Sequence, residues 1–107
     1  MNEVFDISSL EWQPVRPEVS HNVFGKAMLN GKVKAVLTRV APGGKFNMHA
    51  DAYAHLFYFL SGEGTVWVGK KQSEARSGVV VQVDAGEPHA YENTGKEDLL
   101  LVSLNIP

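Results

Sequence analysis

Short apolar stretches separated by glycine- and proline-rich turns run through the chain from residue 21 to its end. They are rich in β-branched and aromatic residues, which favour strands. The clearest of them read VKAVLTRV, HLFYFL, TVWVG, GVVVQV and LLLVSLNI. No window keeps a 3.6-residue period long enough to predict a helix. Short strands at even spacing predict an all-β fold, either a sandwich or a barrel.

Two turn signals divide the first half of this pattern. Asn30-Gly31 separates two alternating stretches, His21–Leu29 and Lys32–Val40. It predicts a tight hairpin because both residues tolerate positive φ. The next break between strands is expected at residues 41–44, which read Ala-Pro-Gly-Gly.

The predicted organisation is a single domain with a short leading arm. Residues 1–20 contain Pro14 and Pro17 and are expected to form an N-terminal arm with at most one edge strand. Residues 21–107 are expected to form a barrel. A length of 107 residues suits one compact domain and not two.

Composition and charge narrow the classes of partner. Hydrophobic residues make up 44% of the chain, enough for a real core, and the net charge is −2. The charges are scattered, which argues against a nucleic-acid partner or an anionic membrane surface, since both favour a basic patch. No apolar run approaches the roughly 20 residues of a membrane helix, and the start lacks a signal-peptide pattern. A cytoplasmic location is therefore expected.

Three of the four histidines lie in two segments that suit a metal site. His49 and Asp51 are two residues apart, so on a strand both point to the same face. His55 opens the apolar stretch HLFYFL, and His89 follows a Gly-Glu-Pro turn. The chain has no cysteine, so any metal must be held by imidazole and carboxylate groups.

The spacing of these residues resembles the two motifs of the cupin family. The first motif is glycine, five residues, His, one, His, three or four, Glu, six, glycine, and its positions are filled here by Gly43, His49, Asp51, His55 and Gly62. The second is glycine, five residues, Pro, one, Gly, two, His, three, Asn, and its positions are filled by Gly78, Asp84, Gly86, His89 and Asn93. Three positions depart from the pattern, because Asp51 replaces the second His, His55 replaces Glu, and Asp84 replaces Pro.

The resemblance implies an antiparallel double-stranded β-helix, the jelly-roll barrel of cupins. It also implies one divalent metal ion on His49, Asp51, His55 and His89, since three His and one carboxylate are present although two positions are exchanged. Such a set suits Fe, Mn, Zn, Ni or Cu and does not distinguish among them. The resemblance further implies a homodimer, with outward apolar residues as the interface: Trp12, Met48, Tyr58, Leu60 and Trp67.

Alternation along the strands indicates which other residues face the metal. If His55 points inward, so do Phe57 and Phe59. By the same argument Asn47 shares the face of His49, and Tyr91 shares the face of His89. These residues are expected to line a cavity for a small-molecule ligand or simply to fill the barrel.

Three classes of function remain open, because one fold hosts many activities. The leading one is a small-molecule metalloenzyme. Dioxygenase chemistry is its first subtype, because His49, Asp51 and His89 also match the two-His-one-carboxylate set of non-haem iron oxygenases. An isomerase, lyase or cyclase that uses the metal as a Lewis acid is the alternative subtype. The other classes are a non-catalytic module that binds or senses a small ligand such as a sugar, and a storage or structural relative.

Overall fold

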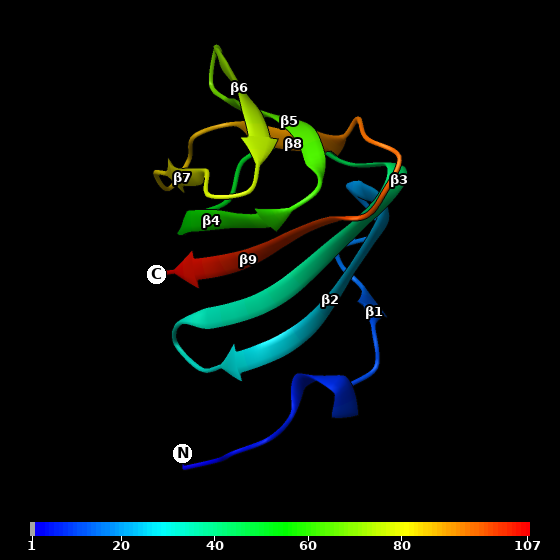
Figure 1. Cartoon of the computed structure of the whole chain (residues 1–107). Coiled ribbons are helices and arrows are strands. Elements are labelled where there is room, and N and C mark those ends of the chain that lie inside the picture. The colour runs from blue at the N-terminus through cyan, green and yellow to red at the C-terminus, as the bar shows by residue number, and fades with distance from the viewer. Residues whose placement is uncertain (1) are drawn as a thin grey trace.

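The computed structural model describes residues 2–107 and shows an almost entirely antiparallel β structure (Figure 1). The all-β prediction and the jelly-roll barrel are therefore confirmed. A 3₁₀ turn at Ile7–Ser9 precedes the strands, which are β1 Gln13–Pro14, β2 Ser20–Asn30, β3 Lys34–His49, β4 Ala54–Ser61, β5 Glu63–Val68, β6 Lys71–Arg76, β7 Val80–Val83, β8 His89–Asn93 and β9 Leu99–Ile106.

The strands form one sheet that rolls up on itself. Its hydrogen-bonded order is β6-β5-β8-β3-β9-β4-β7, and β2 adds to β3 and carries β1. In Figure 1, β5, β6 and β8 form the upper wall, and β2, β3, β9 and β4 form the lower one. Strand β3 belongs to both walls, since it pairs with β9 in its first half and with β8 in its second.

The expected strand break at residues 41–44 is wrong, because β3 continues through it from Lys34 to His49. Gly43 has a φ of +78°, a conformation that glycine adopts without the steric cost of a side chain. This residue marks the change from pairing with β9 to pairing with β8. The bend brings His49, at the end of β3, opposite His89 at the start of β8.

The predicted hairpin between β2 and β3 is confirmed, because Asn30 of β2 pairs with Lys34 of β3. The turn itself differs from the prediction, since Asn30 is still part of β2, residues 31–33 form the connection, and neither Asn30 nor Gly31 has a positive φ. One strand has no counterpart in the apolar pattern. Strand β6 reads KQSEAR, and only Ala75 in it is buried. It lies at the end of the sheet, where charged side chains protect an edge from pairing with other chains.

The core lies between the two walls and follows the predicted alternation on β4. His55, Phe57 and Phe59 point inward and are buried, whereas Tyr58 and Leu60 between and beyond them are exposed. The buried apolar cluster comprises Val23, Val40, Phe46, Phe57, Phe59, Val66, Ala75, Val83, Tyr91, Leu99 and Leu101.

The N-terminal arm packs on the barrel of its own chain. Strand β1 pairs with β2, and the ring of Trp12 lies 4.7 Å from Nζ of Lys26 and 4.6 Å from the guanidinium carbon of Arg39. Contacts within its own chain thus explain the packing of the Trp12 ring without a partner subunit. The homodimer stays a prediction that rests on the exposed Met48 and on the outer face of β4, and light scattering would test it.

No helix among residues 2–107 is long and apolar enough to cross a membrane.

Candidate metal centre

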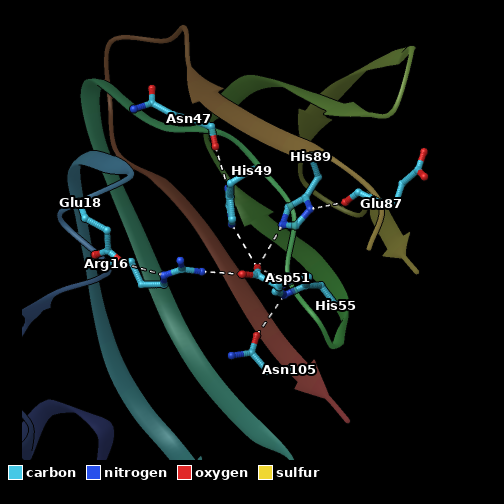
Figure 2. A network of polar contacts seen from close by, with 9 residues as sticks. All are labelled: Arg16, Glu18, Asn47, His49, Asp51, His55, Glu87, His89 and Asn105. Carbon is cyan, nitrogen blue, oxygen red and sulfur yellow. Dashed lines mark hydrogen bonds and ion pairs between the residues drawn. The ribbon is translucent and has the colours of Figure 1, made fainter. Parts of the chain in front are cut away.

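The four proposed ligands converge at one end of the barrel, where three strand ends meet (Figure 2). His49 ends β3, and Asp51 follows it in the connection to β4. His55 is the second residue of β4, and His89 is the first residue of β8. The fourth histidine, His21, is exposed and outside this cluster.

One carboxylate oxygen, Oδ2 of Asp51, lies at the centre of the cluster. It is 2.9 Å from Nε2 of His55, 3.2 Å from Nε2 of His49 and 3.9 Å from Nε2 of His89. His49, Asp51 and His89 each offer one ligand atom within 4.8 Å of the others. His55 is not in that mutually close group, but its Nε2 contacts Asp51 and its ring centroid is 4.5 Å from that of His89.

Each imidazole is oriented by a contact at its other nitrogen. Nδ1 of His49 donates to the carbonyl oxygen of Asn47 at 2.7 Å, and Nδ1 of His89 donates to that of Glu87 at 2.9 Å. The ring of His55 lies between two oxygens, because Nδ1 is 3.1 Å from the side-chain oxygen of Asn105 and Nε2 is 2.9 Å from Oδ2 of Asp51, and the one proton of the neutral ring can serve either contact. Because a carbonyl oxygen can only accept, Nδ1 carries the proton in the neutral rings of His49 and His89, and the Nε2 atoms of these two rings present lone pairs to the centre.

This arrangement has the electrostatics of a cation site. The lone pairs of His49 and His89 and the carboxylate oxygen of Asp51 repel one another unless a positive charge lies among them. Extra protons on the rings would supply that charge, but burial lowers the pKa of His89. A divalent metal ion satisfies all four groups together, and hydrogen bonds at Nδ1 are the usual support of a ligand imidazole. The residues therefore fit a metal ion.

The other oxygen of Asp51 binds Arg16, a residue that the sequence motifs do not indicate. Nη1 of Arg16 donates to Oδ1 of Asp51 at 2.7 Å, and Nε donates to Glu18 at 3.1 Å (Figure 2). Burial works to raise the pKa of Asp51, but the contacts with Arg16 and His55 outweigh it, and the pKa lies below its ordinary value. Asp51 is thus a carboxylate over the whole neutral range.

A cavity of about 70 Å³ adjoins the four ligands. Phe57 and Tyr91 line it, as the alternation predicts, and the ring of Phe46 also lines it, stacked on His49 at 4.8 Å. Burial raises the pKa of Tyr91, so its phenol stays protonated. The cavity has room for a small molecule or a few waters.

Two of the expected cavity residues lie elsewhere. Phe59 is fully buried in the core behind Tyr91, at 6.3 Å between ring centroids, and does not line the cavity. The side chain of Asn47 is exposed, and the residue contributes only its carbonyl group. The expectation for Asn47 is wrong because the register of β3 with β8 shifts between Phe46 and His49, which breaks the strict alternation and turns Phe46 inward.

Polar residues of β9 complete the cavity. Ser103 and Asn105 line it from the face of β9 that carries the core residue Leu101. The signal for them was present in the sequence, because alternation from Leu101 leads inward to Ser103 and Asn105. Polar residues on the inward face of a core strand point to a site rather than to packing.

Fold and site together define a small β-barrel protein with a histidine-rich centre at one end. A family model described as a cupin domain matches residues 36–105. The chain therefore belongs to the cupin family, and the resemblance of its motifs is confirmed.

Individual relatives agree with this assignment. An oxalate-binding protein of Thermotoga maritima is 29% identical over 101 residues, which cover 94% of this chain and 84% of that protein. The polyketide cyclase RemF of Streptomyces resistomycificus superposes with a TM-score of 0.87 at 15% identity, over 98% of this chain and 79% of that one. A predicted oxalate decarboxylase of Thermotoga maritima superposes with a TM-score of 0.83 at 23% identity, over 97% and 98%. At these identities the solved structures show the fold alone.

Proposed function

We propose that this chain is a metal-dependent cupin that holds one divalent transition-metal ion on His49, Asp51, His55 and His89 and uses it on a small molecule in the adjoining cavity. The observation that carries the proposal is the convergence of the Nε2 atoms of three histidines on one carboxylate oxygen. Such a cluster is costly without a cation and favourable with one.

The donor set decides which metals are suitable. Imidazole nitrogen and carboxylate oxygen suit Fe, Mn, Zn, Ni or Cu. Four protein ligands leave room for a further ligand on an octahedral ion, which a catalytic site requires. Bound there, the metal would supply either Lewis-acid polarisation of an oxygen-bearing substrate or redox chemistry. The chain's own residues would orient the substrate and exclude water.

Two kinds of catalysis are consistent with this site. Dioxygenase chemistry is the first, because His49, Asp51 and His89 form the two-His-one-carboxylate group and lie close together. A lyase, isomerase or cyclase using Lewis-acid chemistry is the second. A polyketide cyclase and a predicted oxalate decarboxylase are among the structures that share the fold.

A non-catalytic binding module is the second candidate function. The relative at 29% identity is described as an oxalate-binding protein. The small volume of the cavity, about 70 Å³, also suits a ligand of a few heavy atoms better than a sugar chain. A cytoplasmic location and a homodimer remain predictions under either function.

Elemental analysis of the protein purified without added metal tests the proposal. We expect close to one divalent transition-metal ion per chain, or uptake of one ion on titration of chelator-treated protein. Iron in the purified protein would favour the dioxygenase, whereas zinc or nickel would favour Lewis-acid chemistry. A chain that neither carries nor takes up such an ion contradicts the proposal.

A further inference from the structure

Arg16 brings a fixed positive charge to the cavity wall. Of the described residues that line the cavity, it is the only arginine or lysine. It comes from the N-terminal arm, in the short connection between β1 and β2, and not from either motif. Its guanidinium stays charged at every relevant pH.

The contacts of Arg16 leave part of its hydrogen-bonding capacity free. A guanidinium has five N–H donors, and within residues 2–107 the contacts go from Nε to Glu18 and from Nη1 to Asp51. No partner is found there for the donors on Nη2. The side chain is 38% exposed, whereas that of Asp51 is 7% exposed, so Arg16 faces the open side of the site. Asp51 anchors the guanidinium and leaves one edge of it available to a ligand.

The backbone of Arg16 is unusual. Its φ is +45°, in the left-handed region that residues with a side chain seldom adopt. The turn is closed by a hydrogen bond from the amide of Val19 to the carbonyl oxygen of Arg16 at 3.0 Å. A non-glycine residue persists in this conformation when its surroundings hold it there, and such residues cluster at functional sites. Here the result is a guanidinium directed to Asp51 and the cavity.

We propose that Arg16 is a specificity-determining residue that binds the carboxylate of a small acidic ligand at the mouth of the metal site. This rests on the proposed function, since the ligand occupies the same cavity. The planar edge of a guanidinium matches the two oxygens of a carboxylate.

The charge balance of the site favours such a ligand. A divalent ion and Arg16 contribute three positive charges against one negative charge on Asp51. Glu18, the other partner of Arg16, is 61% exposed, so solvent screens it. The aromatic rings of Phe46, Phe57 and Tyr91 make part of the wall apolar, beside the polar Ser103 and Asn105, and an ionic contact is stronger next to such apolar surface than in water. The ligand class is therefore a small acid with a compact, partly apolar body.

The test compares glycolate with its neutral amide, glycolamide, which has nearly the same shape. Dissociation constants are measured by NMR titration, with and without saturating metal, for wild type and for Arg16→Gln, Arg16→Lys and Arg76→Gln. Arg76 is the matched control, because it is a surface arginine that pairs with Glu74 away from the cavity. The metal content of every sample is measured first.

We expect wild type and Arg76→Gln to prefer glycolate over glycolamide. Arg16→Gln should reduce that preference about 10- to 100-fold, as for the loss of a charged hydrogen bond, with glycolamide binding nearly unchanged. Arg16→Lys should restore part of the preference, since it restores charge without the planar edge.

Two results would overturn the proposal. One is that Arg16→Gln keeps the wild-type ratio of the dissociation constants for glycolamide and glycolate. The other is that it weakens glycolate and glycolamide equally, as expected of a residue that only anchors the arm. Failure to take up metal would contradict the proposed function instead. In that case the preference for glycolate over glycolamide, measured without metal, would still decide the role of Arg16.

Discussion

Replacing His89 with alanine should nearly abolish metal binding while the barrel remains folded. His89 is the only ligand from the second motif, and its ring lies between those of His49 and His55, with centroids 4.4 and 4.5 Å away. Without it, the remaining ligands all come from the seven-residue stretch 49–55. They would contact the ion from one side only. Altering even the groups that support a ligand weakens metal binding about 10- to 100-fold, so loss of the ligand itself should exceed about 100-fold.

The matched control is His21→Ala, because His21 is exposed and outside the cluster. It should bind metal as wild type does. Far-UV circular dichroism checks the fold of both variants, and His89→Gln, closer in volume, covers the case in which the cavity left by alanine unfolds the chain. Metal content equal to wild type in a folded His89→Ala protein would remove His89 from the site.

Asp51→Asn should separate the metal-binding role of Asp51 from its structural role. The substitution keeps the shape and one oxygen but removes the carboxylate charge, so metal affinity should fall at least about 10-fold, the smallest effect of altering a group that only supports a ligand. The metal-free protein should be little affected. The new amide can donate to the Nε2 lone pair of His49, which the carboxylate opposes, while the lost pairing with the partly exposed Arg16 costs about 1 kcal/mol or less.

Thermal unfolding with and without metal measures both effects. A ligand that binds only the folded state raises the melting temperature according to its affinity, so the metal-induced rise should shrink in Asp51→Asn. Asp84→Asn is the control, since the side chain of Asp84 is exposed and does not line the cavity. A metal-induced rise in melting temperature as large in Asp51→Asn as in wild type would show that Asp51 only orients the imidazoles and that three histidines hold the ion.

The parts of the site that follow from spacing were predictable from the sequence. Alternation along β4 places His55 and Phe57 on one inward face, because consecutive side chains on a strand point to opposite sides. The two motifs predicted that His49 and His89 lie together, and the register of β3 with β8 pairs them directly. Both results depend on strand alternation and motif spacing, which can be read directly from a sequence.

Other features depend on long-range packing that no local pattern displays. Gly43 looked like a strand end but bends one continuous strand, because glycine permits both outcomes. The irregularity between Phe46 and His49 exchanges the faces of Phe46 and Asn47, which strict alternation cannot anticipate. Arg16 reaches Asp51 across 35 residues of chain from an arm without any motif.

A crystal structure of the metal-loaded protein, with the ion located by its anomalous scattering, tests the central claim most directly. The account predicts one ion within about 2.0–2.2 Å of Nε2 of His49, His55 and His89 and of a carboxylate oxygen of Asp51. An ion held by other residues, or no ion at this end of the barrel after soaking, would contradict it.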